Sequence, residues 1–221
     1  MITVHHLNNS RSQRVLWLLE ELEVPHTIRR YQRDPATMLA PPELRAVHPL
    51  GKSPVITDGD LTLAETGAIV DYLLDRYGAG RLVPPHGTGD WWKLRYWMHH
   101  AEGSAMPPLV MTLLFGKLPE RVPFLLRPLA RRIMDGAQKG FVAPNLERLK
   151  GHWNDSLAAT GWFAGPEMTA ADIMMSFPLE AAASRSPFGA GRPHPGAFLE
   201  RIHARPAYRR ALERGGPYAY A

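Results

Sequence analysis

A polar junction near the start of the chain is the first place where this sequence could do chemistry. The stretch VHHLNNSRSQRVLWLL spans residues 4–19, and Asn8, Asn9 and Ser10 separate its strand-like beginning from its apolar, helix-like end. A helix that begins here leaves its first backbone N–H groups without partners inside the helix. Polar side chains at such a junction can cap the helix, and the free N–H groups can receive an anion. Both uses stay open at this point.

Two further segments place polar groups at the starts of predicted elements. The segment KSPV (52–55) precedes a β-prone run, and its proline can adopt the cis form that turns the preceding backbone outward. Glu65 and Thr66 stand at the first turn of a predicted helix. They suit an N-cap, but a helix start with a hydroxyl also receives a carboxylate well.

Several other kinds of site are disfavoured or excluded. The chain has no cysteine, so it forms no disulfide, Cys-based zinc site or thiol nucleophile of its own, and sulfur chemistry requires an external thiol. The GKS triplet (51–53) resembles the end of a phosphate-binding loop, but Ala46 occupies the required glycine position. His99, His100 and Glu102 are close together, yet only His99 and Glu102 share a helical face. Helix packing is therefore favoured there, and no metal site is predicted.

The composition is that of an ordinary globular protein. Hydrophobic residues make up 45% and charged residues 21% of the 221 residues, and charge or proline interrupts every apolar run before membrane-spanning length. The formal charge is +5, but its best cluster, Arg127, Arg131 and Arg132, favours a solvated helix face or subunit contact over a nucleic-acid site. The first residues lack the pattern of a signal peptide. We therefore expect a cytoplasmic protein that binds neither nucleic acid nor membrane.

Strand and helix patterns alternate in the first part of the chain. The turn Asp58-Gly59-Asp60 joins two short β-prone runs and predicts a hairpin. Apolar spacing and proline positions indicate the other elements. The predicted order βαβαββα is that of a thioredoxin-like domain, and its elements are strand 2–6, helix 14–23, strand 26–32, helix 43–47, strands 54–57 and 61–63, and a helix ending at 77.

The rest of the chain is predicted to be helical. The stretch GAGRLVPPHGTG (78–89) is rich in glycine and proline and breaks every periodic pattern, as a linker would. We expect an α/β domain at 1–78, a linker at 79–89 and an all-α domain at 90–221. The predicted helices of the second domain are 90–118, 124–160, 170–184, 196–204 and 206–214.

Three segments together resemble the glutathione transferase superfamily. SRSQRVLWLLEEL, HPLGKSPVI and LAETGAIVDYL occur in this order and spacing before a helical domain, and the resemblance covers the whole chain. GPEMTAADI (165–173) is similar to the capping box of that family, in which Thr169 accepts from the helix start and Asp172 reaches back. The ending RPAYRRALERGGPYAYA resembles bacterial members with a serine-type active site. The resemblance implies a cytosolic homodimer that uses glutathione as cosubstrate.

The resemblance also implies which residues hold glutathione. The backbone of Val55 beside Pro54 would pair with the cysteinyl unit of the peptide. Glu65 would face its ammonium group, and Thr66 its γ-glutamyl carboxylate. Lys52 could reach the glycyl carboxylate or remain a solvated loop lysine. The implied glutathione-binding residues are Lys52, Ser53, Pro54, Val55, Glu65 and Thr66.

Ser10 is the implied catalytic residue. In serine-type classes a hydroxyl at the end of the first strand donates to the sulfur of glutathione, and the helix start favours the thiolate. Asn8 or Asn9 could donate instead, Ser12 lies close by, and Ser10 could be only a helix cap. The predicted catalytic residues are therefore Ser10 and Asn9.

The second substrate is implied to bind between the domains. The function implied is activation of the glutathione thiol for attack on a hydrophobic electrophile, as in detoxification. The alternatives are a glutathione-dependent peroxidase or disulfide reductase, and a glutathione-binding or structural module without turnover. Predicted walls of the electrophile pocket are Trp97, His100, Met106, Pro108, Met111 and Phe115.

Overall fold

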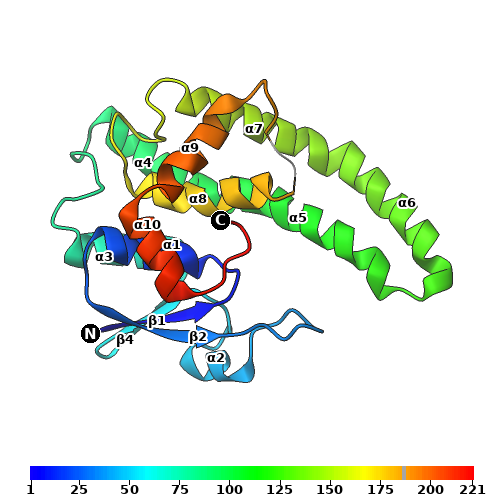
Figure 1. The fold of residues 1–221 in the computed structure, drawn as a ribbon, viewed down its shortest axis with the longest axis horizontal. Coiled ribbons are helices and arrows are strands. Elements are labelled where there is room, and N and C mark those ends of the chain that lie inside the picture. The colour runs from blue at the N-terminus through cyan, green and yellow to red at the C-terminus, as the bar shows by residue number, and fades with distance from the viewer. Residues whose placement is uncertain (186–187) are drawn as a thin grey trace.

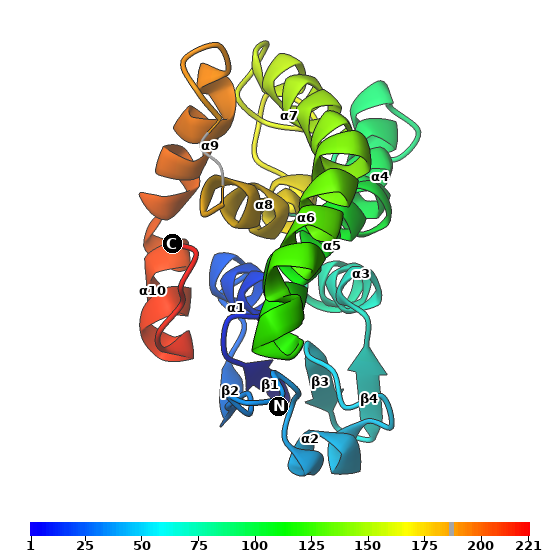
Figure 2. The same ribbon diagram turned by 90° about the vertical axis from the view of Figure 1, so that its right-hand side faces the viewer.

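A mixed sheet of four strands forms the base of the molecule (Figures 1 and 2). This computed structural model describes residues 1–185 and 188–221. The strand order is β2-β1-β3-β4, with β1 (Ile2–Leu7) parallel to β2 (His26–Tyr31). Strand β3 (Val55–Asp58) runs antiparallel to β1, and β4 (Leu61–Ala64) pairs with it as a hairpin. The predicted hairpin is thereby confirmed.

Helices cover the two faces of this sheet. Helices α1 (Ser12–Glu21) and α3 (Thr66–Tyr77) lie on one face, and the short helix α2 (Pro42–Val47) lies on the other (Figure 2). Side chains alternate along a strand, so Ile2 and Val4 enter the main core beneath α1. Leu7 instead packs with Tyr31 and Leu44 in a small cluster beside α2.

Helix α1 is buried on every side. Its residues from Ser12 to Glu20 are all buried, because the sheet lies below it while α8 (Ala170–Ala183) and α10 (Pro206–Gly215) pack against it. Arg205 makes two hydrogen bonds to Glu21, at 2.6 and 2.8 Å, and Arg210 donates to Glu20 at 2.8 Å. These ion pairs join the end of the chain to its beginning.

Two long helical runs follow α3, and each contains a π turn. The first comprises α4 (Gly89–His100), a π turn (Ala101–Ala105) and α5 (Met106–Lys117); the second comprises α6 (Arg127–Ala137), a π turn (Gln138–Val142) and α7 (Ala143–Leu157). Short 3-10 turns at Leu118–Arg121 and Phe124–Leu126 connect the two runs. Prolines stand just after both π turns, where a proline ring clashes with the preceding turn and removes an N–H donor. The sequence pattern predicted two uninterrupted helices and missed these turns.

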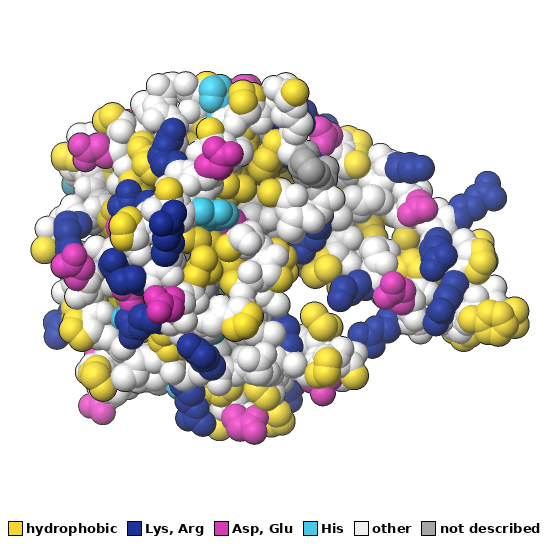
Figure 3. Space-filling view, viewed as in Figure 1, with side chains coloured by type: hydrophobic (Ala, Val, Ile, Leu, Met, Phe, Trp, Pro, Cys, Tyr) yellow, Lys and Arg dark blue, Asp and Glu magenta, His cyan; other side chains and the backbone are white. Residues whose placement is uncertain are grey.

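Helices α5 and α6 form an arm that projects from the rest of the molecule (Figure 1). Its tip carries apolar side chains on the surface (Figure 3), among them Phe124, which is 71% exposed, and Leu125, which is 76% exposed. None of the helices within the described residues is both long and apolar enough to cross a bilayer.

The capping box before α8 is present as predicted. The Thr169 N–H donates to Asp172 Oδ2 at 2.7 Å, and the Ala171 N–H donates to the Thr169 hydroxyl at 3.3 Å. Asp172 also accepts from the Phe163 N–H at 2.9 Å, so its carboxylate joins the helix start to the preceding loop. Burial raises the pKa of Asp172 to about 6.

The predicted fold class, a thioredoxin-like domain followed by a helical region, is confirmed. Helix boundaries shift by a few residues, and at α2 and α9 (Pro193–His203) a proline opens the helix earlier than the apolar pattern indicated. Helix α9, for example, begins three residues before the predicted start. The division at 78 and 89 stays a prediction, since a single main core contains side chains from both halves of the chain.

Candidate active site

Ser10 lies at the junction of β1 and α1 with only 4% of its surface exposed. Its Oγ accepts the Ser12 N–H at 3.3 Å and lies 2.7 Å from Ser12 Oγ. Ser53 Oγ is 3.5 Å away on the other side. Ser10 therefore satisfies one free N–H of the helix, and its own proton remains available, because a hydroxyl accepts and donates at once. Ser10 can therefore cap the helix and donate a hydrogen bond to an anion at the same time.

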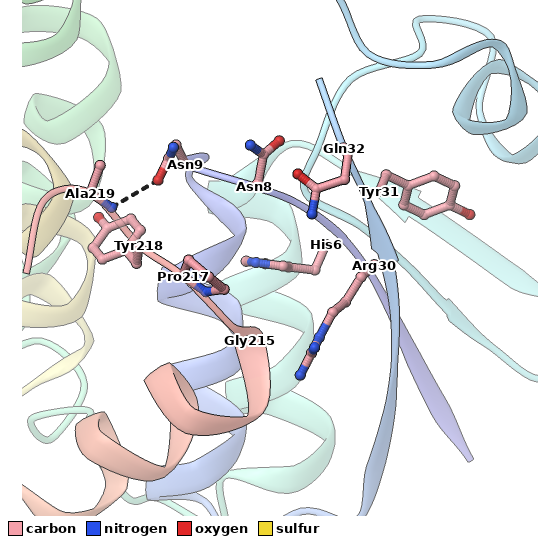
Figure 4. Close-up of a pocket in the computed structure, with 10 residues that line it drawn as sticks. All are labelled: His6, Asn8, Asn9, Arg30, Tyr31, Gln32, Gly215, Pro217, Tyr218 and Ala219. Atoms are coloured by element: carbon pink, nitrogen blue, oxygen red, sulfur yellow. Dashed lines mark hydrogen bonds between the residues drawn. The ribbon is translucent and has the colours of Figure 1, made fainter. Parts of the chain in front are cut away.

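The two asparagines beside Ser10 use their side-chain carbonyls to hold backbone. Asn8 Oδ1 accepts the Arg33 N–H at 2.8 Å. Asn9, at a φ of +50°, accepts the Ala219 N–H at 2.8 Å, as the dashed line in Figure 4 shows. Asn9 thus fastens the carboxyl-terminal tail to the junction, and its catalytic role stays a prediction.

The segment at residues 52–55 is attached to the end of β1. The Ser53–Pro54 peptide bond is cis, the form that the sequence allowed. Ser53 Oγ donates to the His5 carbonyl at 2.8 Å and accepts the Leu7 N–H at 3.2 Å. Val55 begins β3, and Lys52 is exposed to solvent. These contacts bring the proline loop beside Ser10.

Glu65 and Thr66 point in different directions at the start of α3. Glu65 has a φ of +69°, which costs about 1 to 3 kcal/mol for a residue with a side chain. Its exposed carboxylate has no partner among the residues that the structure describes. Thr66 is buried, and its hydroxyl accepts from Arg14 Nη2 at 3.4 Å. Strained backbone around an unpaired acid is consistent with a ligand-binding role for Glu65.

A buried arginine behind these residues was not predicted. Arg14 is 1% exposed, and it donates to the Met174 carbonyl at 2.8 Å and to Glu102. Arg11 donates to the other oxygen of Glu102 at 2.8 Å. Burial acts to raise the pKa of Glu102, but the two guanidinium groups outweigh it, so the pKa is lowered. Arg14 therefore connects α1, the start of α3 through Thr66, and the helical region.

A signal for this cluster exists in the sequence. Arg11 and Arg14 are three residues apart just before the apolar helical run that begins at Val15, so they project from the same side of that helix. Their partner is Glu102, for which the sequence favoured ordinary helix packing over a metal site but indicated no partner. Within the described residues, no group of three or more histidine and acidic side chains could hold a metal ion.

The residues predicted to line the electrophile pocket lie in different environments. Trp97 is 3% exposed, with its ring 4.5 Å from that of Phe163, and Met106 is also in the core. Met111 packs partly buried against that core. His100 lines a cavity of about 510 Å³ and accepts from Trp153 Nε1 at 3.0 Å. This cavity lies among α4, α5 and α7, and the electrophile assignment stays a prediction.

A second cavity, of about 290 Å³, lies where the tail passes the ends of β1 and β2 (Figure 4). The tail leaves α10 and is fixed by Tyr218, whose hydroxyl donates to Glu180 Oε2 at 2.5 Å. No local pattern in the sequence predicted this return of the chain to its beginning. Its lining residues are His6, Asn8, Asn9, Arg30, Tyr31, Gln32, Gly215, Pro217, Tyr218 and Ala219.

Comparison with known proteins agrees with this arrangement. The family described as glutathione S-transferase, N-terminal domain, matches residues 10–76. Glutathione S-transferase 3 of Schizosaccharomyces pombe is 36% identical, over 82% of this chain and 74% of that protein. The chain belongs to the glutathione S-transferase family. Glutathione S-transferase 1 of Saccharomyces cerevisiae is 31% identical, over 97% of this chain and 95% of that protein.

A solved structure extends this likeness to the whole fold. The crystal structure of a glutathione S-transferase from Actinobacillus pleuropneumoniae superimposes with a TM-score of 0.78 at 34% identity, covering 97% of this chain and 93% of that one. The predicted superfamily and enzyme class are thereby confirmed. The serine-type active site and the bacterial subtype stay predictions, because membership of the family does not decide either.

Proposed function

We propose that this protein is a glutathione transferase in which Ser10 holds the sulfur of glutathione as a thiolate. The observation that carries this proposal is the place of Ser10, at the start of a buried helix and 3.5 Å from Ser53 of the proline loop. A hydroxyl donor and free helix N–H groups favour an anion there. The names of the relatives support glutathione as the cosubstrate.

The proposed site holds the two ends of the peptide separately from its sulfur. The unpaired carboxylate of Glu65 suits the ammonium group of the γ-glutamyl unit. Thr66 at the first turn of α3 suits the adjacent carboxylate. Val55 would pair with the cysteinyl backbone, and exposed Lys52 can reach the glycyl carboxylate. Binding at both ends then orients the sulfur toward Ser10.

Chemistry in this site consists of making the thiolate and presenting it to an electrophile. Lowering a thiol pKa by about two units corresponds to roughly 2.7 kcal/mol of preference for the anion. The thiolate then attacks an electrophilic carbon and forms the thioether, while the leaving group departs or a conjugated bond is saturated. Since the chain has no cysteine, glutathione supplies the only thiol nucleophile.

The test is the pH profile of conjugation in wild type and Ser10→Ala. If Ser10 stabilises the thiolate, the pKa of bound glutathione rises toward its free value in the variant, and turnover at pH 7 falls about 10² to 10³-fold. Affinity for glutathione, measured by calorimetry, should change little because the peptide ends are held elsewhere. Higher pH should recover part of the turnover.

Asn9→Ala serves as the matched comparison. It removes the contact to the tail without touching the Ser10 hydroxyl. Superimposable pH profiles for wild type and Ser10→Ala would show that Ser10 only caps the helix, with a stability loss of about 1 kcal/mol. A shifted profile in Asn9→Ala alone would move the catalytic role to Asn9. Glutathione binding without turnover on any electrophile would favour a binding module.

A homodimer is the second part of the proposal. The arm of α5 and α6 exposes Phe124, Leu125, Leu126, Leu129 and Ile133, each more than half exposed (Figure 3). Apolar patches of this kind on soluble proteins mark contact surfaces. The patch supports burial against a second copy, in agreement with the predicted assembly. The cytoplasmic location stays a prediction.

A further inference from the structure

A chain of short hydrogen bonds leads from Ser10 away from the glutathione site. Ser10 Oγ lies 2.7 Å from Ser12 Oγ, and Ser12 Oγ lies 2.8 Å from His6 Nδ1. The exposed fractions of these residues are only 4%, 0% and 3%. The imidazole of His6 lines the 290 Å³ cavity at the tail and points toward Pro217 (Figure 4). The chain thus joins the sulfur position to a separate cavity.

We propose that Ser10, Ser12 and His6 form a proton wire that carries the thiol proton of bound glutathione to this cavity. The inference rests on the proposed function, because that function places the sulfur beside Ser10. Ser12 and His6 act through Ser10 and are positioning residues rather than groups that touch the substrate.

The local fold explains how these three side chains meet. Side chains alternate along β1, so His6 lies on the same face as Ile2 and Val4, beneath α1. Ser12 is the first residue of α1, directly above the end of that strand. The strand end and the helix start are therefore linked by the His6–Ser12 hydrogen bond.

Before transfer, each donor in the wire points away from the sulfur. The thiol S–H donates to Ser10, Ser10 O–H donates to Ser12, and Ser12 O–H donates to His6 Nδ1. The imidazole carries its proton on Nε2, at the cavity. This arrangement uses one donor from each hydroxyl and one from the neutral ring.

Transfer reverses every bond in the wire. The S–H bond breaks and its proton goes to Ser10; the Ser10 proton passes to Ser12, and the Ser12 proton to His6 Nδ1. His6 releases its Nε2 proton to water in the cavity, so one proton leaves and no residue changes its charge. The product state has Ser10 donating to the thiolate, with Ser12 and His6 donating behind it, which strengthens that hydrogen bond.

The surroundings of His6 suit such a relay. Burial, together with Arg30 on the adjacent strand, lowers the pKa of His6 to about 4, so the ring is neutral at physiological pH and changes only its tautomer. The other polar side chains that line this cavity are Asn8, Asn9, Tyr31, Gln32 and Tyr218, and Gln13 of α1 lies beside it near Gly215. Gly215 of α10 lies beside the ring, since a Cβ there would be 3.7 Å from His6 Nε2, an ordinary contact distance.

The alternative path through Ser53 does not lead to solvent. Ser53 O–H donates to the His5 carbonyl at 2.8 Å, and its oxygen accepts from the Leu7 N–H. If Ser53 accepted a proton from Ser10, it would have to give its own proton to the His5 carbonyl oxygen. A backbone carbonyl cannot pass that proton on. Ser12 is therefore the exit from Ser10 among the hydroxyl groups around it.

The experiment measures the rate at which glutathione binding releases its proton. Wild type, Ser12→Ala and His6→Gln are mixed with glutathione in weak buffer containing a pH indicator, in a stopped-flow instrument. We expect proton release to slow about tenfold or more in both variants. Ser12→Ala removes the hydroxyl between Ser10 and His6, and the glutamine of His6→Gln keeps polar contacts but cannot exchange tautomers as imidazole does. Ser12→Thr keeps the hydroxyl and should restore fast release.

His5→Gln is the matched control. His5 precedes His6 on the same strand but points to the opposite face, where its Nδ1 lies 2.8 Å from the Tyr31 hydroxyl. The His5→Gln variant should release the glutathione proton at the wild-type rate. Equal rates in wild type, Ser12→Ala and His6→Gln would overturn the wire.

A measurement on wild type alone covers the case in which a variant does not fold. Four protons moving together, three along the wire and one from His6 Nε2 to water, predict a curved dependence of the release rate on the fraction of D2O. A single transfer to water predicts a straight line and would overturn the proposal. Failure of the proposed function is seen separately, as an unchanged thiolate absorbance of bound glutathione in Ser10→Ala.

Discussion

Replacing Glu102 by glutamine tests the ion-pair cluster behind the glutathione site. The substitution keeps the shape of the side chain and removes its charge. Arg14, with 1% of its side chain exposed, then loses the carboxylate that compensates its buried charge. It keeps the Met174 carbonyl and the Thr66 hydroxyl as acceptors. We expect the free energy of unfolding to fall because a buried cation is left without its counter-ion.

The structure sets the size of this effect. Removing one partner of a fully buried ion pair costs about 3 to 5 kcal/mol, whereas an exposed pair contributes about 0 to 1 kcal/mol. The Glu102 side chain is 29% exposed, and the glutamine oxygen still accepts one hydrogen bond. The expected loss is therefore about 2 kcal/mol. Arg11→Ala removes only the more exposed of the two arginines that pair with Glu102, because the Arg11 side chain is 38% exposed. It should lower the free energy of unfolding by less than about 1 kcal/mol.

Urea denaturation at several pH values is the assay. The pKa of Glu102 is lowered in the folded protein, so the unfolded chain takes up this proton first as the pH falls. The contribution of Glu102 is fully present above the ordinary glutamate pKa of about 4.3 and is lost as the pH falls through the lowered value. The difference between wild type and Glu102→Gln should therefore shrink in acid. A difference below about 0.5 kcal/mol at pH 7, or one independent of pH, would refute the reasoning.

Three further predictions concern binding, the capping box and assembly. Glu65→Gln and Thr66→Ala should each weaken glutathione binding by about 1 to 3 kcal/mol, and calorimetry showing wild-type affinity in both would remove their assignment. Asp172→Asn should lower the free energy of unfolding by about 1 to 3 kcal/mol at pH 7, because its amide NH2 would face a backbone N–H; unchanged denaturation would contradict this. The protein should sediment as a dimer of its 24.7 kDa chain and Leu125→Asp as a monomer, whereas a monomeric wild type would count against the dimer.

Local patterns in the sequence were enough to predict most of the architecture. Alternating and helical apolar spacing predicted the strands and helices around the sheet, because each element buries one face of its own sequence. The Thr169–Asp172 capping box was legible because its two partners are only three residues apart. The π turns were not predicted, since they arise where a proline meets a helix that packing keeps continuous.

The candidate site, too, could be predicted only in part from the sequence. Ser10, Pro54, Glu65 and Thr66 were identified from the sequence because each stands at the start of an element, where backbone groups are free. The resemblance to the glutathione transferase superfamily supplied the roles that are proposed for these residues.

Contacts between distant parts of the chain were decided only by the tertiary structure. Glu102 meets Arg14 across 88 residues, and the tail reaches Asn9 across 210. The sequence shows that such groups are polar but not which partner each will find. His6 is the clearest case: as a residue in a strand pattern it carried no signal, and only the packing of α1 onto β1 places Ser12 within 2.8 Å of its ring.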